Sequence, residues 1–469
     1  MYLSGLRLSN YKSFKEADFK FSKITLLLGP NSGGKTSVLA SILSCLQSPQ
    51  FPAYFLPNGS LVETGDFREI VKSHRVASNI SIDLNFTNKW AKVSTAPVKL
   101  GGVYERDAKT SMPRMVSASV KNKDIAWSIS KAKDKYTLKW SYKPLGASSN
   151  FVKKFPEMAR AFESVFYAAA QIKTAVPEPG AKVKKISVAS VAKEAEQHMV
   201  GDVPSEGEHQ ASNLSTIFDF DPKEQRISNF WALTALKASK DIVSDFLKTF
   251  VYIGSYRIPP QRTYYHLVGP DLKVGVCGQN AIEQVLAWEN AKSDKLPQLV
   301  KSLKSIGLAA SIKANKLAGG RFEVTVKSLG SSVSSSIVDV GFGINQFLPV
   351  LVAELQTKDG STVAVSQPET HLHPSVQAEV ASHFVKNVKD RGFCYLVETH
   401  SEYLINRIRR HVVAGDLAPE DVAVYYLEQS NSGGVIHDIT FEKTGRIVGA
   451  PPGFFTTYQV DVMNIAIGR

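Results

Sequence analysis

The run Gly-Pro-Asn-Ser-Gly-Gly-Lys-Thr at residues 29–36 constrains the fold of this chain more than any other feature. It fits the pattern G-x-x-x-x-G-K-[ST], in which glycines let backbone N–H groups converge on phosphate oxygens. The apolar, partly β-branched run 24–28 precedes it, and apolar residues at helical spacing follow from Val38 to Leu46. A loop between a buried strand and a helix N-terminus binds anions. The sequence therefore predicts a nucleotide-binding α/β fold.

Length and composition are those of an ordinary globular protein. The chain has 469 residues, of which 43% are hydrophobic, enough for two or three domains. It contains no apolar stretch long enough to span a membrane, and its first residues lack the apolar core of a signal peptide. Cys45, Cys277 and Cys394 are far apart and form no metal-binding or disulfide pattern. We therefore expect a cytoplasmic protein with no membrane partner.

The net charge of +13 leaves two interpretations open. An excess of this sign favours an anionic partner, such as nucleic acid or an acidic protein. Because the lysines are scattered, a merely soluble basic surface explains the charge equally well. Lysines alternate with aromatic residues between 121 and 143, which is typical of a half-buried strand and which we prefer to a nucleic-acid interface.

We expect three regions along the chain. Residues 1–150 form an N-terminal ATPase lobe, in which a mostly antiparallel sheet surrounds the nucleotide site. Its predicted strands are 3–9, 17–28, 79–86 and two or three strands within 115–142.

Residues 151–250 read as a helical and partly mobile insertion, and residues 251–469 as a C-terminal ATPase lobe. Within the insertion, 157–172 and 223–250 have helical patterns, and 173–222 are rich in Pro, Gly, Ser, Glu and Lys. The C-terminal lobe is predicted to contain a parallel sheet with flanking helices. Its predicted strands lie near Val251, within 321–340, from Val338 onward, and at 363–365, 393–397 and 422–427, with helix at 280–306. Because no heptad repeat continues for several turns, no long coiled coil is expected.

Three polar segments lie where ligands bind in α/β sheets. Residues 338–346 form a Gly-rich turn before a helix, which is either a second anion cradle or a plain strand-to-helix turn. Residues 362–374 bring Glu369, His371 and His373 to a strand end, but zinc would need a further fitting ligand. After the strand 393–397, His400 is placed either to contact a γ-phosphate and orient water or to hydrogen-bond within its loop.

The order of these motifs resembles the ABC-type ATPase head shared by chromosome-maintenance (SMC), RecF and OLD-family proteins. More closely, the chain resembles AAA-annotated ATPases of bacterial anti-phage defence operons, which include relatives of the ATPase subunits of PARIS (AriA) and Septu (PtuA). The segments that carry this closer resemblance are NGSLVETGDF at 58–67, GSYRIPP at 254–260, GFGINQFLPVL at 341–351, ETHSEYLINRIRR at 398–410 and PPGFF at 451–455.

The resemblance implies ATP and Mg²⁺ as cofactors and assigns a role to each motif. The phosphates and Mg²⁺ would be held by Asn31, Ser32, Gly33, Gly34, Lys35, Thr36 and Ser37. The turn 341–346, with Gly343, Asn345 and Gln346, would be the signature motif that contacts the γ-phosphate bound to a second protomer. Residues 370–373 would link the two sites, and His400 would be the switch histidine. Two copies would then close face to face around ATP.

The chain departs from the wider superfamily at the strand end that usually carries Asp-Glu. Here the pair is Ser366-Gln367, so the Mg²⁺ position has a hydroxyl instead of a carboxylate, and Gln367 orients water without accepting its proton. Glu369 is a substitute base if the backbone directs it inward. The signature serine is also replaced, by Asn345. We therefore expect slow hydrolysis or none, with ATP serving mainly to lock an assembly.

The resulting functional hypothesis is an ATP-binding subunit that self-associates and acts as sensor or scaffold in anti-phage defence. Its partners would be a second copy, a separately encoded effector such as a nuclease, and a nucleic acid or phage protein as trigger. No Asp-x-Asp pair follows His400, so we expect any nuclease to reside in another chain. The alternative is a RecF-like ATPase that binds DNA in repair or replication. A third interpretation is a nucleotide-binding structural module without turnover.

Overall fold

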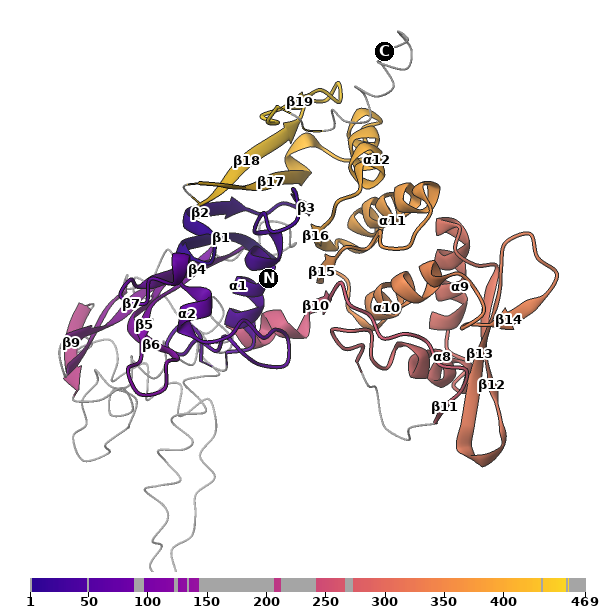
Figure 1. The fold of residues 1–469 in the computed structure, drawn as a ribbon, viewed down its shortest axis with the longest axis horizontal. Coiled ribbons are helices and arrows are strands. Elements are labelled where there is room, and N and C mark those ends of the chain that lie inside the picture. The colour runs from indigo at the N-terminus through magenta and orange to yellow at the C-terminus, as the bar shows by residue number, and fades with distance from the viewer. Residues whose placement is uncertain are drawn as a thin grey trace, which may run out of the picture.

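The computed structural model describes most of the chain as two large sheets with packed helices (Figure 1). The described residues are 2–48, 50–87, 97–121, 125–132, 135–142, 206–211, 242–265, 273–431, 433–452 and 454. The helix predicted at 157–172 lies outside these residues, as do most of segment 173–222 and residues 223–241 of the next predicted helix. Residues 242–248 of that helix are helical.

The first sheet has eight antiparallel strands in the order β2-β1-β4-β5-β6-β7-β8-β9. Their bounds are β1 (Tyr2–Tyr11), β2 (Phe14–Lys20), β4 (Ile80–Thr87), β5 (Val98–Arg106), β6 (Pro113–Lys121), β7 (Ile125–Ala132), β8 (Lys135–Tyr142) and β9 (Glu206–Ala211). The predicted antiparallel sheet is confirmed, and residues 125–132 and 135–142 form strands as expected. Within the predicted insertion, residues 206–211 form a strand that pairs with β8, which the sequence did not predict.

The second sheet has seven strands in the order β10-β15-β16-β3-β17-β18-β19. They are β10 (Phe250–Ile253), β15 (Thr362–Ser366), β16 (Cys394–Glu398), β3 (Ile24–Leu28), β17 (Val422–Ser430), β18 (Gly433–Phe441) and β19 (Ile447–Val448). The strands from β10 to β17 are parallel, as predicted, whereas β18 and β19 add antiparallel pairs. The expected strand 17–28 divides into β2 and β3, which belong to different sheets. Strand β3 thus lies centrally among strands from the C-terminal part of the chain.

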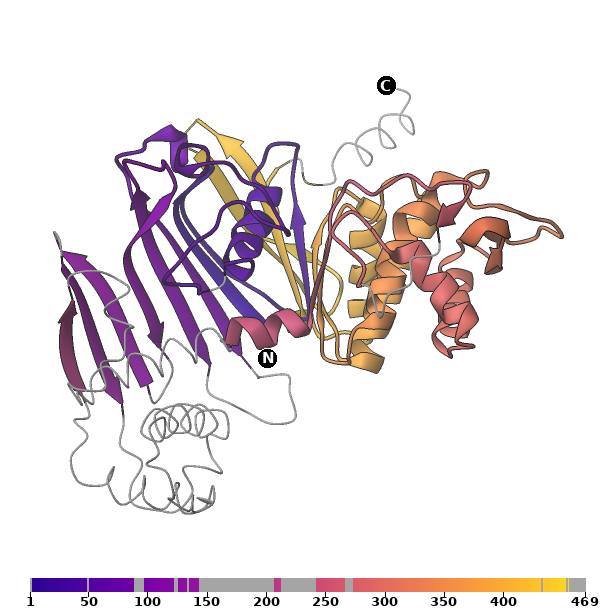
Figure 2. The same ribbon diagram turned by 90° about the horizontal axis from the view of Figure 1, so that it is seen from below.

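Helices cover both faces of the second sheet (Figure 2). Helix α1 (Lys35–Leu46) packs between the two sheets, where Leu27, Ala364 and Leu396 point toward it. On the other face lie α8 (Ala281–Asn290), α9 (Lys295–Ile306), α10 (Phe342–Gln356), α11 (Pro374–Arg391) and α12 (Glu402–Val413). Because side chains alternate along a strand, each buried strand contributes to two hydrophobic cores.

A small antiparallel sheet packs beside α8 and α9. It contains β11 (Tyr264–Tyr265), β12 (Ser311–Lys316), β13 (Arg321–Lys327) and β14 (Ser334–Ser336). Other short helices among the described residues are α2 (Phe67–Ile70) and the 3₁₀ turns Lys72–His74, Ala318–Gly320 and Pro419–Asp421. The single helix predicted at 280–306 is two helices, α8 and α9. The strand predicted from Val338 onward is wrong: the backbone turns, with the Asp339 N–H donating to the Ser336 carbonyl, and α10 follows.

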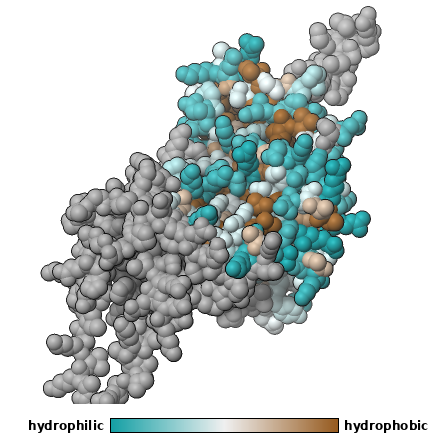
Figure 3. Space-filling model, turned by 90° about the vertical axis from the view of Figure 1, so that its left-hand side faces the viewer, coloured by the Kyte–Doolittle hydropathy of each residue, from teal (hydrophilic) through white to brown (hydrophobic). Residues whose placement is uncertain are grey.

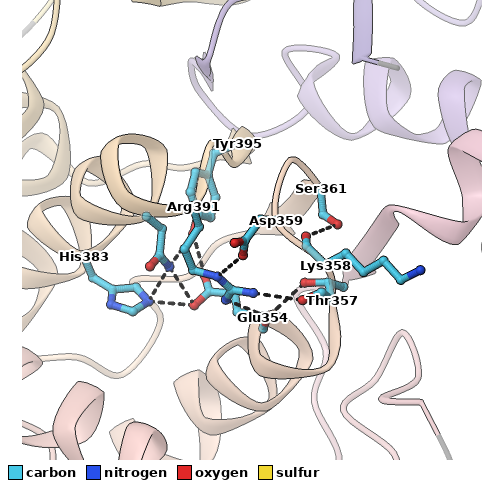
Figure 4. Close-up of polar contacts among 9 residues, drawn as sticks. Glu354, Thr357, Lys358, Asp359, Ser361, His383, Arg391 and Tyr395 are labelled. Atoms are coloured by element: carbon cyan, nitrogen blue, oxygen red, sulfur yellow. Dashed lines mark hydrogen bonds and ion pairs between the residues drawn. The ribbon is translucent and has the colours of Figure 1, made fainter. Parts of the chain in front are cut away.

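A buried polar network fixes α10 against α11 and β16 (Figure 4). The Glu354 carboxylate accepts hydrogen bonds from Asn387 at 3.2 Å and from the Tyr395 hydroxyl at 2.8 Å, and lies 2.6 Å from His383 Nε2. Glu354 is 2% exposed. Arg391 donates to the carbonyls of Glu354 and Thr357, which ties the end of α11 to the end of α10. This network lies at the end of the sheet opposite the nucleotide loop and sets the position of α10.

The described surface is predominantly hydrophilic on the face shown in Figure 3, where hydrophobic residues form small separate patches. Among the described residues, no helix has both the length and the hydropathy needed to cross a membrane.

Candidate nucleotide-binding site

The loop 29–36 connects β3 to α1, as the sequence predicts. Its glycines are required by close packing: a Cβ at Gly29 or Gly33 would collide with the carbonyl oxygen of Leu427 on β17. Gly34 has φ +102°, and a Cβ there would lie 2.8 Å from the ring of Phe14. The loop therefore packs between Phe14 and Leu427, and the N-terminus of α1 lies at the carboxyl edge of the parallel strands.

Lys35 is buried at 4% exposure, and its ammonium group donates to the carbonyls of Gly29 at 3.0 Å and Pro30 at 2.7 Å. Burial lowers the pKa of Lys35, an effect opposed by the nearby charges of Glu398 and Glu369. The ammonium is thus held over the loop by neutral carbonyls. Around it, the side chains of Asn31, Ser32 and Thr36 are exposed, whereas that of Ser37 is half-buried.

A carboxylate lies beside the predicted magnesium-binding hydroxyl. The Thr36 hydroxyl donates to Glu398 Oε1 at 2.6 Å, and the Ser366 hydroxyl donates to Glu398 Oε2 at 2.9 Å. Glu398 is 3% exposed and ends β16, where the strand register sets it opposite Ser366. Glu398 was not among the predicted site residues, although an acidic residue ending a buried strand was the available signal.

Ser366 and Gln367 lie at the end of β15 next to this carboxylate. Ser366 is buried, and its hydroxyl is 3.3 Å from that of Tyr252. Gln367 has φ 47°, and its backbone N–H donates to the carbonyl of Glu398 at 2.7 Å. The left-handed conformation turns the chain away from the sheet at the residue predicted to orient water.

The side chain of Glu369 contacts the backbone of His400. The His400 N–H donates to Glu369 Oε1 at 2.6 Å, whereas Glu369 Oε2 is buried without a hydrogen-bond partner. Burial raises the pKa of Glu369, and the hydrogen bond from His400 partly offsets this effect. His400 is exposed; desolvation lowers its pKa, as does the charge of Lys35. A carboxylate with a raised pKa and an unpaired oxygen is suited to accept a proton.

The neighbouring histidines do not join this cluster. The exposed His371 ring lies 5.8 Å from that of Phe342, and His373 caps α11 by accepting from the Ser375 N–H. Across the described part of the chain, no group of three or more His, Cys, Asp or Glu side chains is arranged to hold a metal ion.

The Gly-rich turn forms the start of α10 and packs on the segment 370–373. A Cβ at Gly343 would lie 2.9 Å from a methyl carbon of Leu372 and 3.2 Å from the His371 carbonyl oxygen, so a larger residue does not fit easily. Asn345 is 8% exposed, and its amide donates to the Ile337 carbonyl at 3.4 Å. Its side chain is therefore directed into the protein, whereas Phe342 is 65% exposed.

Arg257 connects this turn to the end of β15, a role that the sequence analysis missed. Its guanidinium donates to Gln346 Oε1 at 3.3 Å and to the carbonyls of Ser366 at 2.8 Å and Gln367 at 3.2 Å. Arg257 is 4% exposed, and burial lowers its pKa to about 10, with the charge of Glu369 opposing the shift. A chain of contacts thus runs from α10 to the loop: Arg257 bonds Gln346 and the Ser366 carbonyl, the Ser366 hydroxyl bonds Glu398, and Glu398 bonds Thr36.

Residues 1–405 match the family model described as AAA ATPase domain. The chain belongs to this ATPase family. An ATPase family implies nucleotide binding, and the hydroxyls, carboxylates and ammonium around the loop 29–36 form a donor set that fits a nucleotide with Mg²⁺.

Three other likenesses accompany the family match. The DNA replication and repair protein RecF of Corynebacterium jeikeium (strain K411) is 49% identical over 43 residues, which cover 9% of this chain and 10% of RecF. The Smc head domain of Pyrococcus furiosus, bound to the C-terminal domain of ScpA, is 10% identical over 99% of both chains, with a TM-score of 0.43. The SMC head domain from Thermotoga maritima is 9% identical over 93% of this chain and 99% of that one, with a TM-score of 0.37.

Proposed function

We propose that this ATPase-family protein binds ATP with Mg²⁺ at the loop 29–36 and uses it to join two copies of the chain. The observation that carries the proposal is the path of contacts from Thr36 through Glu398, Ser366 and Arg257 to Gln346. Such a path would couple the phosphate-binding loop to the turn that would contact a nucleotide held by the second copy. A conformational change at one site would then alter the conformation of the other.

Self-association is supported by the exposed apolar side chains around that turn. Phe342 and Val338 on the turn are 65% and 36% exposed, and Tyr256 and Ile258 on the facing segment are 72% and 47% exposed. Arg257 bonds to Gln346, and an ion pair of 2.7 Å between Arg262 and Asp339 further joins the two segments. Large apolar side chains exposed together are typical of protein–protein contact surfaces.

Hydrolysis in this proposal is slow. Lys35 and the loop N–H groups bind phosphate, and bound Mg²⁺ would supply charge neutralisation at the phosphates. Gln367 orients water but accepts no proton, so Glu369 is the remaining candidate base. One oxygen of Glu369 is already held by the His400 N–H. Phosphate release faster than ~1 s⁻¹ would contradict slow turnover.

The biological role that we infer is a sensor or scaffold in anti-phage defence, which holds a separate effector such as a nuclease until a trigger arrives. The motifs at 254–260, 341–351 and 398–410 support this role through their resemblance to ATPases of defence operons. Stable co-purification with the product of the adjacent gene would support it, whereas purification without any partner from the native host would count against it.

A second candidate function, DNA binding of the RecF kind, is favoured by two observations. They are the net charge of +13 and the short RecF match. Binding of the isolated protein to duplex DNA should then weaken steeply with added salt, because phosphate contacts release counterions. Absence of salt-sensitive DNA binding would remove this candidate.

The first test of the proposal is equilibrium ATP binding by the purified chain in Mg²⁺, compared with Lys35→Ala. We expect measurable binding by the wild type and a large loss in the variant, because the ammonium over the loop is removed. Lys386→Ala, on the surface of α11, is the matched control and should bind ATP normally. Equal binding by wild type and Lys35→Ala would contradict the assignment of this loop.

A further inference from the structure

The end of β15 lacks the acid that a magnesium site needs. Mg²⁺ in nucleotide sites is held by one or two carboxylates together with phosphate oxygens and water. Ser366 contributes only a hydroxyl and Gln367 only an amide. By sequence position alone, the metal would have Thr36 and no carboxylate.

The neighbouring strand brings a carboxylate to the same point. In the parallel register, Glu398 on β16 lies opposite Ser366 on one side and Leu27 on the other. It is therefore placed between the end of β15 and the beginning of the loop 29–36. Its two oxygens lie 2.6 Å from the Thr36 hydroxyl and 2.9 Å from the Ser366 hydroxyl. One acidic group thus contacts both hydroxyls that the sequence assigns to the metal.

The charge of Glu398 is not matched by a direct ion pair among the described residues. Its hydrogen bonds come from neutral hydroxyls, and the ammonium of Lys35 is hydrogen-bonded to the carbonyls of Gly29 and Pro30 instead. Burying a carboxylate charge is costly unless a cation offsets it, and the nearby Lys35 ammonium makes no direct ion pair with Glu398, which is 3% exposed. A divalent cation is the partner that such an arrangement accommodates.

We propose that Glu398 supplies the carboxylate that holds Mg²⁺ in this site, in place of the acid missing at Ser366. The proposal rests on the proposed function, because the metal enters with the nucleotide. Thr36 and Ser366 would contribute hydroxyl oxygens, and phosphate oxygens and water the remainder. The metal-binding charge of the site would then lie on β16, the strand adjacent to β15.

The test measures metal binding separately from turnover. Mn²⁺ is titrated into the complex of the protein with a non-hydrolysable ATP analogue, and bound Mn²⁺ is followed by electron paramagnetic resonance. We expect Glu398→Gln to weaken Mn²⁺ binding by at least about tenfold. Mutation of residues that only hydrogen-bond to metal ligands already weakens metal binding by about 10- to 100-fold. Analogue binding in EDTA should remain, because it depends on Lys35 and the backbone. Glu420→Gln, exposed at the opposite end of the sheet, should change neither.

The double variant Ser366→Asp/Glu398→Gln shows whether weaker Mn²⁺ binding in Glu398→Gln comes from the missing carboxylate or from misfolding. It returns a carboxylate to the end of β15, so Mn²⁺ affinity should recover at least in part. Unchanged Mn²⁺ affinity in Glu398→Gln would overturn the proposal, as would a folded double variant without recovery. Failure of the proposed function has a different signature, since the wild type would then bind no analogue either with Mn²⁺ or with EDTA.

Discussion

At the scale of single residues, the site combines an ordinary phosphate loop with an altered strand end. Lys35 and Thr36 lie where their motif predicts, because a Gly-rich loop between a strand and a helix is encoded locally. Glu398 was not predicted, because its contact with Thr36 depends on which strands are neighbours, and one sequence does not reveal that order. Gln367 places an amide, which in our proposal orients water, where related ATPases have a proton acceptor.

A change at Gln367 tests the interpretation of slow turnover. Gln367→Glu should raise the rate of phosphate release by at least about tenfold, since a positioned general base contributes ~10²–10⁴-fold. The measurement is steady-state phosphate release at saturating ATP and Mg²⁺. Gln298→Glu, on the exposed face of α9, makes the same chemical change away from the site and should leave the rate unchanged. A Gln367→Glu variant that binds ATP but is no faster would show that residue 367 does not limit hydrolysis.

At the scale of elements, continuous apolar runs were the reliable signal. Strands β3, β15 and β16 are buried on both faces and were all predicted, since no loop can tolerate so many apolar residues in sequence. The errors came from weaker patterns. Val338 and Val340 alternate as in a strand, yet the turn at Asp339 separates them from the sheet. The polar strand β9 carries no apolar alternation and has a partner only because β8 is adjacent.

The packing of α10 against α11 and β16 should depend strongly on Glu354. Glu354→Ala leaves the side chains of His383, Asn387 and Tyr395 without their shared acceptor, and leaving a buried polar group unsatisfied costs about 1–3 kcal/mol. Urea denaturation of the full chain measures the free energy of unfolding. The control Asp359→Asn removes the exposed ion pair with Arg391 and should cost about 0–1 kcal/mol. Equal costs for the two variants would show that the buried network contributes no more than a surface pair.

At the scale of the whole molecule, the N-terminal and C-terminal parts of the chain both contribute to the candidate nucleotide site. Strand β3 comes from the N-terminal part of the chain but lies between β16 and β17 from the C-terminal part. Helix α1 packs between both sheets, and Leu427 closes on the loop glycines. The sequence predicted the two kinds of sheet correctly. It did not reveal that β3 completes the C-terminal sheet, because that pairing is a long-range tertiary contact.

The central claim is that ATP joins two copies of the chain, and the molar mass in solution tests it most directly. Multi-angle light scattering of the wild type should show the mass doubling when ATP and Mg²⁺ are added, and no increase with EDTA. Lys35→Ala should keep its nucleotide-free mass in both conditions. If the wild type binds ATP with Mg²⁺ and its mass does not change, the account is contradicted.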